Sequence, residues 1–220
     1  MATAIQAPLY IAAAAHDGCQ PAYGVNIGSG LSGVAGWYNI DNSPTILLSR
    51  IPLVRKLPRI PKWPRDVHRH DVRRGLPFPD RSVSYIYSSH TFEHFNWNDS
   101  LTIAKECFRV LKPGGVLRIV VPDLGLIVRE YLNNKAPTAS HQMVRRLSLN
   151  HGLSDIVHPG ANHSQMFDQK SLVHLFHEAG FANPEVTHFG QSRIPDIAEL
   201  ELEVRKGESL YVESLRQAAA

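Results

Sequence analysis

Apolar residues recur along the chain in short runs that predict strands and in longer, helically spaced segments. Seven runs bounded by turn residues predict strands at residues 23–28, 37–41, 67–71, 82–88, 115–121, 184–189 and 208–214. Helical spacing predicts helices at residues 98–111, 124–133, 139–149 and 169–179. Because strands and helices alternate, we expect a doubly wound, Rossmann-like α/β fold with a seven-stranded, mostly parallel sheet. Ligands of such sheets bind at the carboxyl ends of the strands.

Residues with strong positional preferences mark the ends of these elements. Asn98 or Asp99 is expected to cap the first long helix, and glycines at 114 and 115 turn the chain into the next strand. Asp168 and Gly180 bracket the helix at 169–179 in the same way. Between residues 42 and 66, prolines allow at most one short helix, at 45–49 or slightly beyond.

Composition favours one domain that spans residues 1–220. Hydrophobic residues make up 43% of the chain without a long apolar run, so we expect a full core and no membrane span. The apolar run at 9–15 lacks a preceding Lys or Arg, which argues against a signal peptide. The cysteines are Cys19 and Cys107, and Cys107 falls on the buried face of its helix, so a disulfide is not expected. These features predict a cytoplasmic protein.

Two segments stand apart from this pattern. Residues 42–66 form a basic, proline-rich connection, which is either a solvated surface loop or a surface for an anionic substrate or a partner. Its single aromatic residue, Trp63, argues against a track for single-stranded nucleic acid, and the net charge of +3 is too small to require a nucleic-acid partner. Residues 134–168 are predicted to be an insertion on the substrate side that could cover the site.

A glycine-rich turn at residues 28–36 is followed closely by an acidic residue, Asp41. Gly28, Gly30 and Gly33 match the pattern G-x-G-x-x-G after an apolar stretch. In a NAD-binding unit a helix follows the glycines, and the ribose-binding acid comes about 20 residues later. Here the apolar run at 37–40 leaves no room for such a helix. The spacing therefore favours a nucleoside at this turn and makes an NAD-dependent enzyme the least favoured alternative.

Five motifs follow one another in a fixed order. They are Asn-Ile-Gly-Ser-Gly at 26–30, Gly-Trp-Tyr-Asn-Ile-Asp at 36–41, Leu-Pro-Phe-Pro-Asp at 76–80, Glu-His at 93–94 and Leu-Lys-Pro-Gly-Gly at 111–115. This set resembles the class I S-adenosylmethionine-dependent methyltransferases, specifically the type 11-like branch with a short first crossover. The resemblance covers residues 23–123 well and 163–182 weakly. Asn26 stands where many relatives carry an acidic residue.

The resemblance implies which residues hold the cofactor, S-adenosyl-L-methionine, and its product, S-adenosyl-L-homocysteine. Residues of the glycine turn would contact the methionine part, and Asp41 would accept both ribose hydroxyls. Asp71 would take the adenine amine, or it is only a cap before Arg73. The full set of expected cofactor residues is Asn26, Gly28, Ser29, Gly30, Asp41, Asn42, Asp71, Val72, Ser88, Ser89 and His90.

Histidines are the candidate catalytic residues. A hydroxyl acceptor must lose its proton, and histidine titrates near neutral pH. His90 ends the fourth strand and is the first candidate, followed by His94 and His163, although His94 and Glu93 could instead cap and pack a helix. His90 and His94 have i,i+4 spacing but match no recognised metal pattern, so we assign no metal. A divalent ion that holds the acceptor hydroxyl is the alternative.

The most favoured function is S-adenosylmethionine-dependent O-methylation of a small hydroxylated metabolite or a sugar. Residues 88–91, Ser-Ser-His-Thr, replace the Asn/Asp-Pro-Pro-aromatic motif that binds amines. An RNA or protein methyltransferase that grips its partner through the basic segment is one alternative. A non-catalytic cofactor-binding module is another. The acceptor and the oligomeric state do not follow from the sequence.

Overall fold

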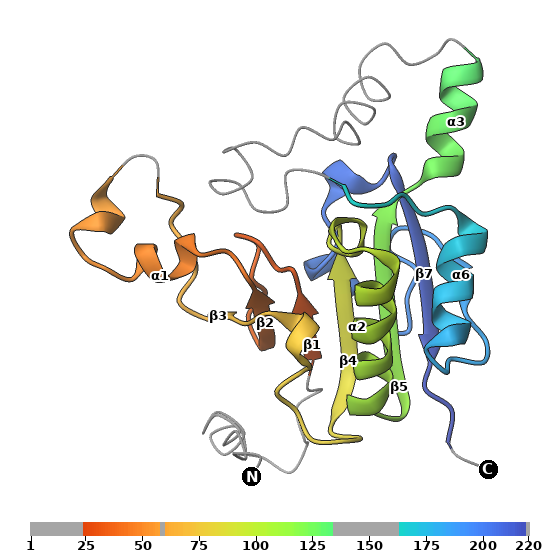
Figure 1. The fold of residues 1–220 in the computed structure, drawn as a ribbon, viewed down its shortest axis with the longest axis horizontal. Coiled ribbons are helices and arrows are strands. Elements are labelled where there is room, and N and C mark those ends of the chain that lie inside the picture. The colour runs from red at the N-terminus through yellow and green to blue at the C-terminus, as the bar shows by residue number, and fades with distance from the viewer. Residues whose placement is uncertain (1–23, 58–59, 134–162, 219–220) are drawn as a thin grey trace.

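The computed structural model describes residues 24–57, 60–133 and 163–218, which build a seven-stranded sheet (Figure 1). Its order is β3 (Val67–Arg69), β2 (Trp37–Asp41), β1 (Gly24–Ile27), β4 (Val83–Ser89), β5 (Leu111–Pro122), β7 (Ser209–Leu215) and β6 (Glu185–Thr187). Strand β7 runs antiparallel to β5 and β6, and the other neighbouring strands pair in parallel. The predicted mostly parallel α/β sheet is confirmed, and all seven strands lie within a few residues of their expected positions.

Four helices lie in the described residues. They are α1 (Thr45–Ser49), α2 (Trp97–Val110), α3 (Leu124–Leu132) and α6 (Gln169–Glu178). The short helix before the prolines is therefore confirmed, whereas the helix expected at 139–149 lies outside the described residues. Short 3₁₀ helices complete the chain: η2 (Val54–Lys56), η3 (Val72–Arg74), η4 (Phe92–His94), η5 (Ile197–Glu199) and η6 (Glu203–Arg205).

One predicted helix cap is wrong and another is confirmed. Helix α2 is capped by Asn96, whose side chain accepts a hydrogen bond from the backbone of Asp99 at 2.9 Å, and not by Asn98 or Asp99. The helix starts earlier because Asn96 is also a good cap and Trp97 packs against the core. Asp168 caps α6 as expected, in a reciprocal capping box with Ser171.

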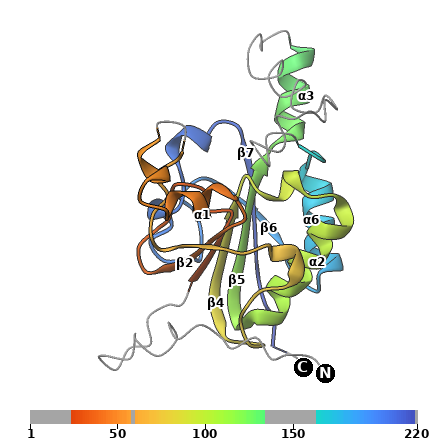
Figure 2. The ribbon, with the colours of Figure 1, turned by 60° about the vertical axis from the view of Figure 1, so that its left-hand side comes forward.

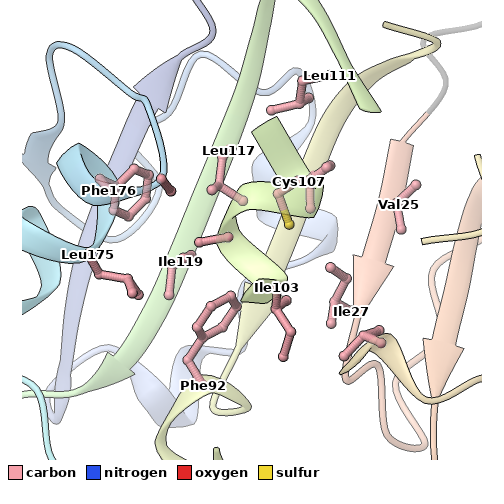
Figure 3. Close-up of a cluster of buried hydrophobic side chains, with 14 of the residues drawn as sticks. Val25, Ile27, Phe92, Ile103, Cys107, Leu111, Leu117, Ile119, Leu175 and Phe176 are labelled. Atoms are coloured by element: carbon pink, nitrogen blue, oxygen red, sulfur yellow. The ribbon is translucent and has the colours of Figure 1, made fainter. Parts of the chain in front are cut away.

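Helices α2 and α6 cover one face of the sheet (Figure 2), where the main core forms. Ile103 and Cys107 of α2 face Leu117 and Ile119 of β5, and Phe176 of α6 packs beside them (Figure 3). The predicted burial of the Cys107 side chain is confirmed, and this burial raises the pKa of its thiol. A continuous apolar layer therefore holds the central strands rigid.

The opposite face of the sheet is covered by a segment with short 3₁₀ helices. Ile194, Ile197 and Leu200 pack on Tyr87 and Tyr211 there. A buried network of ion pairs holds this segment, residues 188–201, against the sheet. Arg118 on β5 donates hydrogen bonds to the Glu201 carboxylate at 2.5 and 2.8 Å and to the Glu213 carboxylate at 3.1 Å. The Arg118 side chain is fully buried, so its charge is neutralised inside the protein.

The strand register brings the ends of β1, β2 and β4 to one level. Ile27 pairs with Ile40 on one side and with Ser88 on the other. The residues that follow these strands therefore meet at one edge of the sheet, as parallel strands require. In the described part of the chain, no helix has both the length and the apolar character needed to cross a membrane.

Candidate functional site

The glycine turn after β1 lies close against the end of β2. The backbone amides of Gly28 and Ser29 both donate to the carbonyl oxygen of Ile40, at 2.8 and 3.1 Å. Gly28 and Gly30 have φ angles of +72° and +55°, which glycine adopts without strain. A β-carbon on Gly28 would collide with the side chain of Thr91, whereas one on Gly30 would meet no atom within 4 Å. The turn is therefore closely packed at Gly28, and it leaves open space beside Gly30.

Asp41 closes this turn from the end of β2. One carboxylate oxygen accepts a hydrogen bond from the backbone of Gly30 at 3.1 Å, and the other accepts from the backbone of Ser43 at 2.8 Å. A carboxylate can accept about four hydrogen bonds, so both oxygens keep acceptor capacity for a ligand. Asn42, the next residue, is exposed at the same edge. The structure therefore brings Asp41 and the glycine turn together, as the sequence predicted.

Asn39 holds the turn through hydrogen bonds and lies outside the site residues predicted from the sequence motifs. Its fully buried amide accepts hydrogen bonds from the backbone of Val34 at 3.0 Å and from Asn26 Nδ2 at 3.1 Å, and it donates to Asp66 at 3.0 Å. The amide group of Asn26, an expected cofactor residue, is thus used to join β1 to β2. An amide in the middle of an apolar strand is the signal that would have revealed Asn39, because buried polar groups need partners.

Ser29 carries a polar atom that suits a ligand at this turn. Its side chain is buried, and within the described residues its hydroxyl has no hydrogen-bond partner. A buried hydroxyl without a partner costs about 1–3 kcal/mol, so such groups usually face a ligand or water. Together with the open space above Gly30 and the remaining acceptor capacity of Asp41, this hydroxyl fits a polar nucleoside cofactor.

Asp71 and Val72 follow β3 at the same edge. The Asp71 carboxylate caps η3 and accepts two side-chain hydrogen bonds from Arg73, at 2.7 and 2.9 Å. This side-chain hydrogen bonding is the main reason why the pKa of Asp71 is lowered. The structure therefore shows Asp71 as a cap before Arg73, which is the alternative interpretation of this residue. The Val72 side chain is buried. Contact of either residue with adenine stays a prediction.

Ser88 and Ser89 end β4 with different surroundings. Ser88 is fully buried, and its hydroxyl donates to the carbonyl oxygen of Ile27 at 3.2 Å, which ties β4 to β1. Ser89 is partly exposed, and its carbonyl oxygen accepts from the Thr91 hydroxyl at 3.1 Å. Thr91 thus joins the end of β4 to the glycine turn, because it also lies against Gly28.

His90 occupies a strained backbone position directly after β4. Its φ angle is +50°, a left-handed conformation that is uncommon outside glycine and is enriched at functional sites. Its Nε2 lies 2.8 Å from the hydroxyl of Ser209, and its Nδ1 lies 3.5 Å from a carboxylate oxygen of Glu93. Both ring nitrogens therefore have a defined polar neighbour. The sequence could not reveal Ser209, which lies at the start of β7.

Glu93, His94 and His163 come together beside His90. The Glu93 carboxylate lies 4.0 Å from His94 Nε2, and the His94 and His163 rings meet edge to face at 5.1 Å between centroids. Glu93 is 1% exposed and His163 is 8% exposed. The structure thus gathers all three candidate catalytic histidines, and it places His94 in η4 before α2 begins.

Backbone hydrogen bonds hold this cluster in place. The amides of Ser164 and Gln165 donate to the Glu93 carbonyl oxygen at 2.7 and 3.2 Å, and the Ser164 hydroxyl donates to the His94 carbonyl oxygen at 2.9 Å. One ligand atom from each of Glu93, His94 and His163 lies within 4.8 Å of the others. One carboxylate and two imidazoles could hold a divalent metal such as zinc. The expectation that no metal is bound stays a prediction.

Known proteins share both the sequence pattern and the fold. The model of a family described as a methyltransferase domain matches residues 11–186. A curated protein of Mycolicibacterium smegmatis, a probable S-adenosylmethionine-dependent methyltransferase, is 40% identical over 62 residues. These residues are 28% of this chain and 23% of that protein, so the chain matches less than a quarter of its relative's length.

Solved structures agree on the fold. A structure of the Haloferax volcanii Trm112 methyltransferase activator in complex with a methyltransferase gives a TM-score of 0.53 at 17% identity, over 91% of this chain and 84% of that one. An S-adenosylmethionine-dependent methyltransferase from Archaeoglobus fulgidus gives 0.52 at 12% identity, over 90% and 86% of the two chains. At such identities the similarity shows a shared class I methyltransferase fold. With the family match over most of its length, the chain belongs to the methyltransferase domain family.

Proposed function

We propose that this protein transfers a methyl group from S-adenosyl-L-methionine to a hydroxyl group of a small molecule, such as a sugar or another hydroxylated metabolite. The observation that carries the proposal is the glycine turn closed on the Asp41 carboxylate, with the buried Ser29 hydroxyl beside it. The family match supports the cofactor, and the histidine cluster at the end of β4 supports a hydroxyl acceptor.

Asp41 and the glycine turn would hold the cofactor. When bound, S-adenosylmethionine would supply a methyl group carried on a positively charged sulfur, to be transferred to the acceptor oxygen. Asp41 accepts hydrogen bonds from the two ribose hydroxyls, using the acceptor capacity that Gly30 and Ser43 leave on its oxygens. The open backbone at Gly30 lets the methionine part approach, and Ser29 donates to a polar atom of that part.

His90 would remove the proton of the acceptor hydroxyl. Its Nε2 receives this proton, either directly when the acceptor replaces Ser209 or through the Ser209 hydroxyl. Glu93, at 3.5 Å from Nδ1, stabilises the imidazolium that results. His94 and His163 enclose the other side of Glu93 and keep its carboxylate in place.

A hollow beside Ser209 supplies a place for the acceptor. It has a volume of about 670 Å³ and lies between the ends of β5, β6 and β7 and the start of α6. Its lining combines charged and hydroxyl groups, including those of Asp123, Lys170, Lys206 and Tyr211, with apolar side chains such as Val186, Phe189 and Leu210. The charged and hydroxyl groups of this lining supply hydrogen-bond partners for a hydroxylated metabolite.

Two variants separate cofactor binding from proton removal. Asp41→Ala should weaken S-adenosylmethionine binding about 100-fold or more, because hydrogen bonds to a charged group contribute about 1.5–3 kcal/mol each. His90→Asn should leave the dissociation constant unchanged and lower turnover about 10²–10⁴-fold. Asparagine is chosen because it tolerates the left-handed backbone at this position. His174→Asn, at an exposed position on α6, is the matched control.

The measurements are calorimetric titration with S-adenosylmethionine, S-adenosylhomocysteine and NAD, and formation of S-adenosylhomocysteine with a panel of hydroxylated metabolites. Binding of the first two ligands without NAD supports the proposal. Failure of both to bind would overturn it, and equal loss of binding in the Asp41 and His90 variants would refute the division of roles. A parallel assay with EDTA should give the same rate, whereas loss of activity would show that the Glu93 cluster needs a metal.

A further inference from the structure

One segment of the surface is both strongly basic and strongly apolar. Between Asp41 and Asp66 the chain contains no acidic residue. The same stretch contains six basic residues: Arg50, Arg55, Lys56, Arg59, Lys62 and Arg65. The whole chain has a net charge of only +3, so this segment carries a concentrated positive charge. We call its described residues, 42–57 and 60–65, the basic protrusion.

The basic protrusion also exposes large apolar side chains. Leu47 is 50% exposed, Leu48 40%, Ile51 47%, Leu53 79% and Leu57 54%. Single exposed leucines are ordinary on protein surfaces, but five such side chains within residues 47–57 form a concentration that marks an interaction site. Figure 1 shows α1 and the following turn standing out from the sheet beside β3.

Specific contacts hold this arrangement in place. Ile46 and Ser49 form the buried side of α1, so the remaining positions of that helix face outward. Trp63 Nε1 donates to the Thr45 hydroxyl at 2.8 Å, and Arg50 donates to the carbonyl oxygen of Val67 at 2.9 Å. The leucines are therefore exposed on a segment that side-chain hydrogen bonds hold against the rest of the fold.

A hollow of about 960 Å³ opens on the same segment. Its lining residues are Ser49, Arg50, Pro52, Arg55, Lys56, Leu57, Ile60, Lys62, Trp63, Pro64 and Arg65. The lining therefore combines cationic groups with apolar ones and contains no carboxylate. Cationic groups beside exposed leucines match a surface that is anionic outside and apolar beneath.

We propose that the basic protrusion binds the surface of a bilayer that contains anionic phospholipids. The exposed leucines and Ile51 insert at the boundary between headgroups and acyl chains, and the Lys and Arg side chains contact the lipid phosphates. A nucleic acid would also satisfy the charge, but it would leave the apolar side chains exposed, and Trp63 is the only aromatic residue in the segment for base stacking.

Binding in this way would hold the candidate site near the bilayer. Strand β2 ends at Asp41, and α1 begins at Thr45, so the basic protrusion starts directly at the carboxyl edge of the sheet. The proposal concerns this surface alone and does not depend on the identity of the methyl acceptor.

Sedimentation with vesicles tests the proposal on the full chain. One set of vesicles contains only phosphatidylcholine, and the other contains about a third phosphatidylglycerol. We expect binding to the anionic vesicles only, weakened by added salt. Arg55→Gln combined with Lys56→Gln should lower the partition coefficient about thirtyfold, and Leu53→Ser combined with Leu57→Ser about tenfold.

Matched controls change equivalent side chains elsewhere. Lys105→Gln combined with Lys170→Gln removes two exposed positive charges outside the basic protrusion. Leu132→Ser combined with Val204→Ser removes side chains that are 72% and 78% exposed. Both control variants should bind vesicles like the unaltered protein. Unchanged thermal unfolding of every variant verifies that the fold is intact.

Several outcomes would overturn the proposal. They are no binding to anionic vesicles, equal binding to both vesicle types, or equal losses in the control variants. Tighter binding to a bulk tRNA than to anionic vesicles at the same salt concentration would assign the surface to nucleic acid instead. Full competition by millimolar glycerol phosphate would show that a free phosphate group, and not a bilayer, is the ligand.

Discussion

Replacement of Arg118 by Met should destabilise the protein strongly. The fully buried guanidinium neutralises Glu201 and Glu213, and it also donates to the Thr187 hydroxyl at 2.6 Å and to the carbonyl oxygens of His188 and Gln191 at 3.1 and 3.0 Å. Met fills a similar volume but leaves the Glu201 carboxylate buried without its cation, whereas Glu213 keeps an ion pair with Arg193 at 3.2 Å. Removing one partner of a buried ion pair typically costs about 3–5 kcal/mol.

The two carboxylates would be affected unequally. Glu213 keeps hydrogen bonds from the Ser192 hydroxyl at 2.7 Å and from the Arg193 backbone at 3.1 Å, whereas in the described part of the chain Glu201 keeps the hydrogen bond from the Gly190 backbone at 2.5 Å. Most of the cost should therefore come from Glu201. The double variant Arg118→Met with Glu201→Gln should recover part of the lost stability, because the buried charge is gone.

Urea unfolding followed by circular dichroism measures these effects. For a domain of this size, a loss of about 3–5 kcal/mol corresponds to a fall in Tm of about 6–20 °C. Arg205→Met is the control, since Arg205 pairs with Glu208 on the surface at 2.7 Å and such pairs contribute about 0–1 kcal/mol. A loss below 1 kcal/mol for Arg118→Met, equal to that of the control, would refute the reasoning.

Two further predictions concern the glycine turn and the cap of α6. Gly28→Ala should abolish cofactor binding measured by calorimetry, because the new β-carbon would collide with Thr91 at a φ of +72°, whereas Gly36→Ala, at a φ of +80° with open space, should retain it. Asp168→Ala should cost about 1 kcal/mol of unfolding free energy at pH 7. Hydrogen bonds from Ser171 lower the pKa of Asp168 in the folded protein, so its contribution is present above the unfolded pKa of about 4 and disappears as the pH falls through the folded pKa. Urea unfolding at pH 7 and pH 3 should therefore show a smaller difference at the lower pH, and an equal difference at both would contradict this.

Local patterns were sufficient for most elements of the fold. The strand at 37–41 and the short helix at 45–49 have the predicted bounds, because apolar runs and prolines act on neighbouring residues. The predicted start of α2 was wrong, since three possible caps, Asn96, Asn98 and Asp99, lie within four residues and packing of Trp97 selects Asn96. For the candidate site, the proximity of Asp41 to the glycine turn was predictable because parallel strands end at one edge.

The sequence by itself determined the order of strands and helices, the glycine turn and the acid that follows it, because these depend on residues near one another in the chain. Only the tertiary structure decided the partners of buried polar groups. Hydrogen-bonded partners lie far apart in the sequence: His90 and Ser209 are separated by 119 positions, His94 and Ser164 by 70, and Arg118 and Glu201 by 83. Such contacts exist because a buried charge or amide needs a partner wherever folding brings one, and no local pattern encodes that partner.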